Sequence, residues 1–212
     1  MLGRYLLGVL LGALVVFLWG AVWWMISPLG FMVTDGAPDE EVVSLLSDSL
    51  RDEGHGVYFY PWVSMRTVQE DGDSALDSYY QAHARGPLFE IIYSPAGKDL
   101  SDPMMYVSGF IHLLASTTLA AALLMMALPA LPTYGRRVLF LFLVGTFAGV
   151  VVELAKPIWF YHPWDYVLYG AGYQVTAWLL AALAMAAVIK PRYGAELRAA
   201  TATPAPPAEP VG

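Results

Sequence analysis

The chain has no cysteine among its 212 residues, and it is poor in charge, with only 14% Asp, Glu, Lys and Arg. Without cysteine the protein has no disulfide framework, no thiolate metal site and no cysteine nucleophile. Hydrophobic residues instead make up 58% of the chain, and the mean hydropathy is +0.54. A soluble domain of this length needs far more charge to cover its surface. The composition therefore predicts a membrane protein.

Sequence motifs of well-known enzyme classes are also missing. The chain has no Gly-rich phosphate loop, GxSxG nucleophile elbow, HExxH motif or paired Asp motif of a lipid-phosphate transferase. Its four histidines are single and far apart in sequence, so they give no paired axial ligands for haem. We expect no cofactor, no bound metal and no nucleic-acid partner, and an enzymatic function is unsupported rather than excluded.

Four apolar stretches are long enough to cross about 30 Å of hydrocarbon, which takes about 20 helical residues. They run approximately from Tyr5 to Ile26, Met104 to Leu131, Val138 to Trp159 and Tyr166 to Ile189. The first is too long for a signal peptide, and no small-x-small cleavage site follows it. We therefore predict an uncleaved signal anchor over residues 1–27 and three further transmembrane helices within residues 104–190.

The distribution of Lys and Arg predicts the orientation, because cytoplasmic flanks of transmembrane helices carry the excess of these residues. Six basic residues flank the spans on one side: Arg4, Arg136, Arg137, Lys190, Arg192 and Arg198. The segment 27–103 holds fourteen acidic residues and only four basic ones. We predict a multi-pass protein of a bacterial inner membrane with both termini in the cytoplasm and residues 28–103 outside. The Pro- and Ala-rich tail, 191–212, is predicted to be disordered.

The segment between the first two spans carries secondary-structure signals of its own. Pro38 with the acids at 39–41 is typical of a helix start, and apolar residues at helical spacing follow up to Leu50. A strand is predicted over 57–60, a second helix over 74–85 capped by Asp73, and a second strand over 88–93. The predicted fold is an all-α four-helix transmembrane bundle with a small extracytoplasmic α+β domain inserted between helices 1 and 2.

Ionisable and polar residues inside the spans form one candidate site. By helical rise, His112 of the second span and Glu153 of the third lie at a similar depth from the outer side. Tyr173 and Gln174 of the fourth span reach the same level. A charge within the membrane is expensive and is a functional candidate by default, so this group is consistent with a proton, ligand or quinone site.

A purely structural interpretation of these residues is also open. Lys156 is three residues after Glu153 on one helix, so the two can form a local ion pair, and His112 can bond a nearby carbonyl or hydroxyl. A metal site is a third alternative, with His112, Glu153 and His162 as the only ligand set.

The loop KPIWFYHPWDY supplies two further candidates, His162 and Asp165. We expect Pro157 to kink or end the third span and Asp165 to cap the fourth. The aromatic residues around the loop are interpreted as an interfacial belt, in which the loop is able to close over the outer mouth of the bundle.

Small residues recur at four-residue spacing in two spans, as Gly8 with Gly12 and Gly145 with Gly149. Such pairs allow close helix contacts, which we expect within the chain rather than between protomers. Trp19 is too deep in its span for a belt residue and is predicted to face the bundle interior.

The chain resembles a group of uncharacterised bacterial four-span integral membrane proteins. The resemblance rests on FLWGAVWWM, GVYFYP, GPLFEIIYSPAG with PMMYVSGFI, and the final aromatic loop leading into YGAGYQVTAWLLAAL. It covers most of residues 16–190 and supports the four-span layout, but it implies no activity.

Two functional hypotheses follow. The first is an accessory, assembly or sensing protein that acts through its outer domain and helix faces on a larger membrane protein complex or a second copy of itself, within the lipid bilayer. The alternative is a small transporter or membrane enzyme that uses His112 and Glu153. The first is favoured because the exposed domain is well developed, whereas polar groups in the bundle are few.

Overall fold

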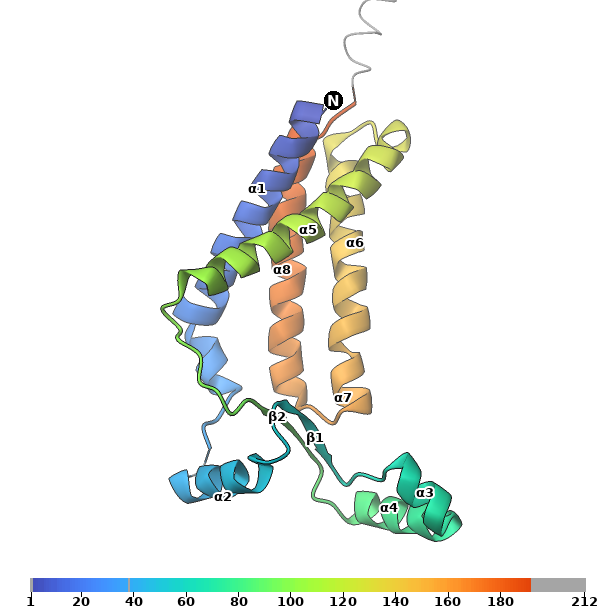
Figure 1. The fold of residues 1–212 in the computed structure, drawn as a ribbon. Helices are drawn as coiled ribbons and strands as arrows, with labels where there is room; N and C mark the ends of the chain where they lie inside the picture. The colour runs from blue at the N-terminus through green and yellow to red at the C-terminus, as the bar shows by residue number, and fades with distance from the viewer. Residues whose placement is uncertain (1, 38, 192–212) are drawn as a thin grey trace, which may run out of the picture. The chain divides into compact units, whose positions relative to one another are not determined.

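Four helices of the chain are long and apolar enough to cross a membrane (Figure 1). The computed structural model describes residues 2–37 and 39–191. These four helical stretches run over Leu2–Ile26, Pro103–Ala130, Tyr134–Trp159 and Trp164–Val188. The four predicted apolar helices are thus confirmed, with ends that differ by a few residues. The predicted tail beyond Pro191 lies outside the described residues.

Most of these stretches contain more than one helical segment. The first consists of α1 (Leu2–Ala21) and a π-helical turn, η1 (Val22–Ile26), and is followed by the 3-10 turn η2 (Pro28–Met32). The second joins α5 (Pro103–Ala127) to the 3-10 turn η3 (Leu128–Ala130), where Pro129 cannot continue an α-helix. The third joins α6 (Tyr134–Glu153) to α7 (Ala155–Trp159), and the fourth is α8 (Trp164–Val188).

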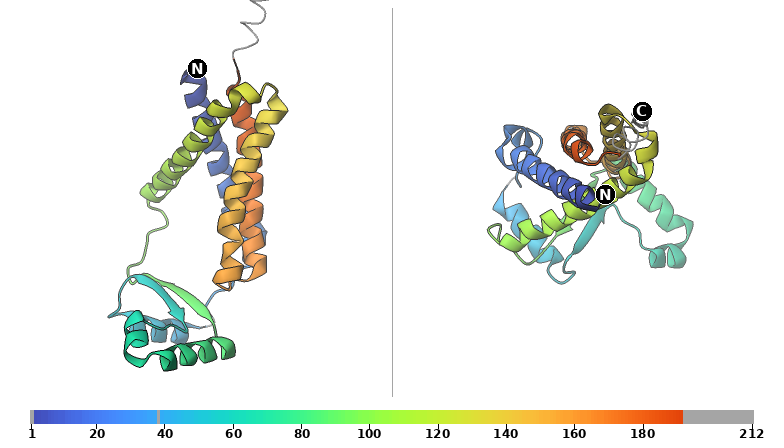
Figure 2. Two further views of the ribbon diagram at one scale, coloured as in Figure 1. Left: turned by 90° about the vertical axis from the view of Figure 1, so that its right-hand side faces the viewer. Right: turned by 90° about the horizontal axis from the view of Figure 1, so that it is seen from above.

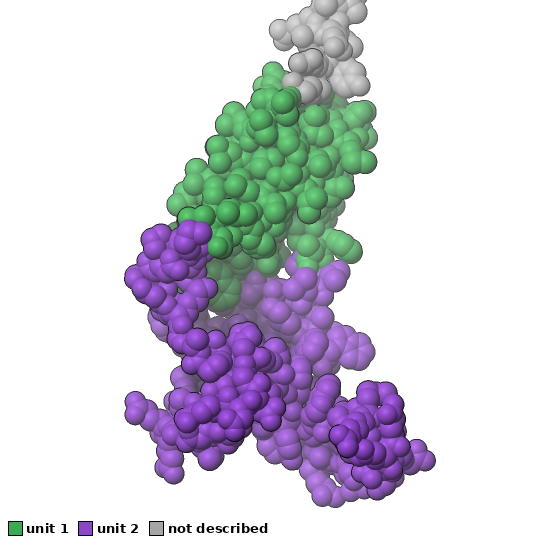
Figure 3. Space-filling view, viewed as in Figure 1, with its two compact units in different colours: residues 1–25, 106–148, 173–212 green, residues 26–105, 149–172 purple. Residues whose placement is uncertain are grey.

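The chain divides into two compact units (Figure 3). Among the described residues, the first unit contains 2–25, 106–148 and 173–191, and the second contains 26–105 and 149–172. The second unit therefore combines the segment between the first two long helices with the end of the third, the loop after it and the start of the fourth.

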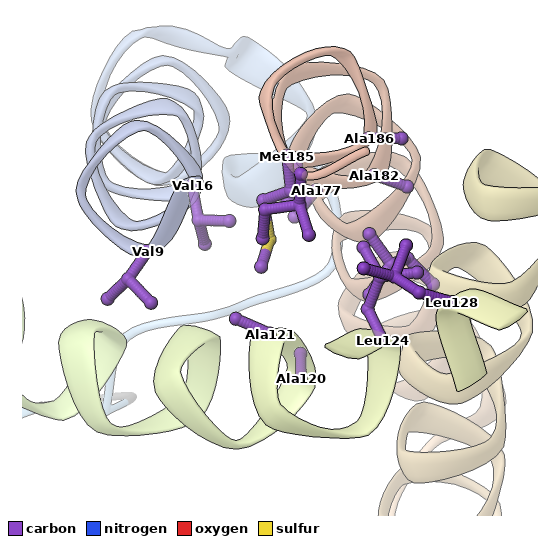
Figure 4. Close-up of a cluster of buried hydrophobic side chains, with 13 residues drawn as sticks. Val9, Val16, Ala120, Ala121, Leu124, Leu128, Ala177, Ala182, Met185 and Ala186 are labelled. Atoms are coloured by element: carbon purple, nitrogen blue, oxygen red, sulfur yellow. The ribbon is translucent and has the colours of Figure 1, made fainter. Parts of the chain in front are cut away.

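The core of the first unit is built from small and branched side chains of its four helices (Figure 4). α5 is inclined to α6 and α8 (Figure 2), so short side chains are needed where the helices cross. The buried cluster comprises Val9, Val16, Ala120, Ala121, Leu124, Leu128, Leu141, Ala177, Ala181, Ala182, Met185, Ala186 and Ile189.

Three of the glycines in the small-residue pairs are used within the chain. A Cβ atom added to Gly8 would lie 2.6 Å from the side chain of Ile189, and one added to Gly12 would lie 2.7 Å from the sulfur of Met185. A Cβ atom on Gly145 would overlap the side chain of Trp178. These glycines therefore let helices of the same chain approach closely, as predicted.

Arg137 is the buried cation of the first unit, with 6% of its surface exposed. Its Nε and Nη2 both donate to the carbonyl of Ala186 at 3.3 Å, and its Nη1 donates to the carbonyls of Leu131 at 3.4 Å and Pro132 at 3.1 Å. Ala186 lies in the last turn of α8, where carbonyls have no partner within the helix. The guanidinium thus provides hydrogen-bond donors for backbone carbonyls at the end of α8 and in the turn before α6.

The segment between the first two long helices forms α2 (Glu40–Leu50), β1 (Gly56–Tyr60), α3 (Met65–Asp71), α4 (Asp73–Arg85) and β2 (Phe89–Tyr93). The two strands pair antiparallel, with Gly56 opposite Tyr93 and Tyr60 opposite Phe89. The hydroxyl groups of Ser47 on α2 and Tyr93 on β2 lie 3.4 Å apart and connect helix to sheet. The predicted mixture of helices and two strands is confirmed.

Helix caps in this segment agree with the predictions in part. Asp39 caps α2, because its carboxylate accepts a hydrogen bond from the N–H of Val42 at 3.0 Å. The predicted cap at Asp73 is wrong: Gly72, with φ of 57°, precedes α4, and Asp73 is the first helical residue. The short helix α3 was not predicted, although Ser64 provides a capping side chain for it.

This inserted segment lacks a closed hydrophobic core. Among the described residues from 27 to 103, only Pro61 is buried. Large apolar side chains are instead exposed, including Trp62 at 71% and Ile92 at 76%. A two-stranded sheet with three short helices is too thin to cover its own apolar faces.

Candidate functional site

The predicted polar residues of the first unit differ in exposure and surroundings. His112 is exposed on α5, and Gln174 is half-buried on α8. Tyr173 lies in an aromatic cluster, with ring centroids 6.3 Å from Trp23 and 5.7 Å from Trp24. Its surroundings are therefore mainly aromatic.

Trp19 packs against the core of the first unit, as its depth predicted, and it also contributes to this aromatic cluster. Its indole Nε1 donates to the hydroxyl oxygen of Thr176 at 2.9 Å, and its ring centroid lies 5.7 Å from that of Trp23. A half-buried indole with a satisfied N–H anchors α1 to α8.

Glu153 is buried at the end of α6, with 7% of its surface exposed. Lys156 donates to its Oε2 at 2.7 Å, so the local pair predicted from the spacing forms. Gly170 of α8 makes room for this carboxylate, because a Cβ atom there would lie 3.1 Å from Oε2. His112 and Glu153 belong to different units, and their grouping stays a prediction.

Pro157 explains why α6 ends at Glu153. A proline ring inside an α-helix clashes with the carbonyl four residues earlier, which here belongs to Glu153, and it removes one hydrogen-bond donor. The helix is interrupted at Leu154, and α7 continues for only five residues. The expected break in the third span is thus observed.

The backbone after α7 takes an unusual conformation. Tyr161 has φ of 59°, in the left-handed region that a bulky side chain rarely adopts. This position directly follows a helix end, where glycine is the common residue. The turn directs the chain towards the inserted segment, since the ring of Tyr161 lies 5.2 Å from that of His83.

The loop candidates His162 and Asp165 have different partners. His162 Nε2 lies 3.0 Å from Oε2 of Glu90 on β2, and both side chains are partly buried. Asp165 was predicted to cap α8 from the position before the helix, but it lies within the first turn of α8. Its carboxylate accepts a hydrogen bond from the N–H of Tyr166 at 2.8 Å. The histidine therefore links the loop to the sheet, and the aspartate supports the helix start.

A cavity of about 260 Å³ lies where this loop meets the sheet and α4. We refer to it as the aromatic cleft. It is lined by Phe59, Tyr60, Pro61, Trp62, Tyr79, His83, Leu88, Phe89, Glu90, Trp159, Phe160 and Tyr161.

Ring contacts hold the walls of the aromatic cleft together. Phe59 stacks on Trp62 with centroids 6.1 Å apart and lies 6.3 Å from Phe160, while Tyr60 stacks on Phe89 at 5.3 Å. Aromatic pairs at these distances contribute beyond simple area burial. Three segments distant in sequence therefore build one apolar wall.

Few acidic or basic side chains line the aromatic cleft. Glu90 is the one carboxylate among the lining residues, and His83 is the one basic side chain, with no lysine or arginine among them. Among the residues that the structure describes, no three His, Asp or Glu side chains lie close enough together to hold a metal ion. The arrangement is suited to binding an apolar or weakly cationic group.

The chain matches no protein-family model, and no curated protein or solved structure gives a significant match. Function must therefore be inferred from the chemistry of the cleft and of the helices. No sequence motif marks the cleft, although Glu90 is unusual as the one acid within the apolar strand FEIIY.

Proposed function

We propose that the protein is an accessory or sensing component of a bacterial inner membrane, which binds a membrane partner through the aromatic cleft. The observation that carries this proposal is the absence of a closed core in residues 27–103, as far as they are described, where only Pro61 is buried. Exposed apolar surface of this kind, on a segment rich in acidic residues, is typical of an interaction site.

The proposed orientation has the termini in the cytoplasm and residues 28–103 outside. It is supported by the sequence order, in which six Lys and Arg residues flank the apolar stretches on one predicted side and the segment between the first two stretches has an acidic excess.

The partner contacts are assigned to the inserted segment rather than to the glycine faces of the helices. Gly8, Gly12 and Gly145 already pack against side chains of this chain, which leaves them unable to receive a second helix. An assembly role through helix faces would have to use the larger apolar residues that face outward.

The alternative, a transporter or enzyme that uses His112 and Glu153, has less support. Glu153 is buried, but its carboxylate is already paired with Lys156. His112 is exposed.

Photocrosslinking in whole cells tests the proposed binding surface. p-Benzoyl-phenylalanine at Phe89, which lines the cleft and is 46% exposed, should give a crosslink to one defined membrane protein or to a second copy of the chain. The same substitution at Tyr80, which is 62% exposed but does not line the cleft, is the matched control. Equal crosslinking at both positions, or none at Phe89, would contradict the proposal.

The orientation has a separate test. A reporter that is active only in the cytoplasm should be inactive when fused after Asp73 and active when fused at the carboxyl terminus. Activity after Asp73 would refute the topology without affecting the assignment of the cleft.

A further inference from the structure

We infer that the aromatic cleft binds a quaternary ammonium cation. This inference rests on the proposed function and adds a regulatory ligand to it, because the cation would occupy the same cleft in competition with the membrane partner. The cleft walls carry the chemistry that such a cation requires: many aromatic rings, one carboxylate and little competing positive charge.

The aromatic lining is the first argument. Eight Phe, Tyr and Trp rings line the cleft, contributed by β1 and the turn after it, α4, β2, and α7 with its loop. The faces of such rings carry negative electrostatic potential, and several rings together form the known type of cage for a quaternary ammonium group.

The charges around the cleft are the second argument. Glu90 supplies a carboxylate that is held in place by His162 at 3.0 Å. The segment 27–103 adds a field of fourteen acidic against four basic residues. Such a field raises the local concentration of cations and disfavours anionic ligands.

Size and hydrogen bonding favour a quaternary ammonium over other cations. A cavity of about 260 Å³ is at the small end for ligand sites. A primary ammonium is strongly hydrated and needs several acceptors, whereas five of the eight rings are Phe or Trp and carry no acceptor oxygen. A metal ion needs several carboxylate or histidine ligands, and no such group of three is found in the described part of the chain. A quaternary ammonium needs neither.

Calorimetric titration of the full chain in a maltoside detergent tests the inference. Choline and tetramethylammonium are compared with 3,3-dimethyl-1-butanol, in which carbon replaces the charged nitrogen of choline. Choline should bind at least about tenfold more tightly than this neutral isostere, because the attraction between cation and rings is lost when the charge is removed. Equal binding of the two compounds, or no binding of choline, would overturn the inference.

Substitutions locate the binding site. Trp62→Leu should weaken choline binding severalfold and leave binding of the neutral isostere nearly unchanged, since leucine keeps an apolar surface but has no ring. Trp62 is 71% exposed, so its replacement should leave the fold intact, as circular dichroism can verify. Trp164→Leu is the matched control, because Trp164 is 55% exposed and does not line the cleft. Choline binding that Trp62→Leu leaves unchanged, or that Trp164→Leu weakens equally, would overturn the assignment.

Glu90→Gln separates the contribution of the carboxylate to choline binding from that of the aromatic rings. The variant should weaken choline binding and leave the neutral isostere unaffected. Phosphatidylcholine added to the detergent micelles distinguishes the source of the cation: strong competition with free choline points to a lipid headgroup, and weak competition points to a soluble compound. If choline fails to bind while Phe89 still crosslinks to one partner, the cation inference is wrong and the proposed accessory function stands.

Discussion

Replacing Arg137 by methionine should destabilise the first unit by about 2–4 kcal/mol. The guanidinium donates four hydrogen bonds to the carbonyls of Ala186, Leu131 and Pro132. A buried acceptor without a partner costs about 1–3 kcal/mol. Ala186 contributes most of the effect, because the Arg137 side chain covers the end of α8, whereas Pro132 is exposed and can bind water instead. Methionine keeps most of the apolar stem, so the loss is chiefly that of hydrogen bonds.

Arg136 provides a closely matched control, because it is adjacent, carries the same charge and is exposed. Arg136→Met should change stability by no more than about 0.5 kcal/mol. Unfolding by SDS in mixed micelles, followed by tryptophan fluorescence and far-UV circular dichroism, compares the two variants. Lysine at 137 should restore only part of the loss, since an ammonium cannot reproduce the planar fork. Equal destabilisation by Arg136→Met and Arg137→Met would refute the capping role and leave only the shared loss of charge.

Two further predictions use the same unfolding assay. Gly145→Ala should cost at least about 2 kcal/mol, because the new methyl group overlaps Trp178, whereas Gly135→Ala on the same helix meets no atom within 4 Å and should be near neutral; similar values for both would refute the close packing. Lys156→Met should destabilise by about 1–3 kcal/mol by leaving the buried carboxylate of Glu153 without its partner, and the added change Glu153→Gln should recover much of that loss; a double variant as unstable as the sum of the singles would contradict the pairing.

The long helices could be predicted from sequence because their signal is local. An apolar run of about 20 residues is sufficient to predict a spanning helix, since every backbone group forms its hydrogen bond within the segment. Pro157 likewise acts on its own helix, and the end of α6 at Glu153 follows from proline geometry. The i, i+3 pair of Glu153 and Lys156 is local in the same sense.

The roles of individual polar residues were harder to predict, because they depend on residues distant in sequence. Arg136 and Arg137 are equivalent as markers of orientation. Of the two, only Arg137 is buried and donates hydrogen bonds to the carbonyl of Ala186, 49 residues away. Aspartate is a residue type that favours helix caps, but Asp73 is the first residue of α4 and Asp165 is the second residue of α8. Cap positions depend on backbone angles that composition does not specify.

The aromatic cleft could not be predicted, because its walls come from segments that are separated by up to about a hundred residues. β1 and β2 are recognisable as strands, but nothing in their sequences specifies contact with residues after α7. The only local clue is that Glu90 and His162 are both polar residues in aromatic surroundings, and their separation of 72 residues hides the pairing.

The conformation of Tyr161 distinguishes two interpretations of the aromatic residues after α6. An interfacial belt requires only that the rings reach the membrane surface, which an unstrained loop can achieve. Tyr161 instead adopts a left-handed backbone conformation, which costs about 1–2 kcal/mol for a residue with a Cβ atom, and its ring lies against His83. Trp164, which is not part of the cleft, remains exposed and fits the belt. Strain at one position, joined to a cleft that it helps to close, supports the proposal that the loop serves binding as well as anchoring.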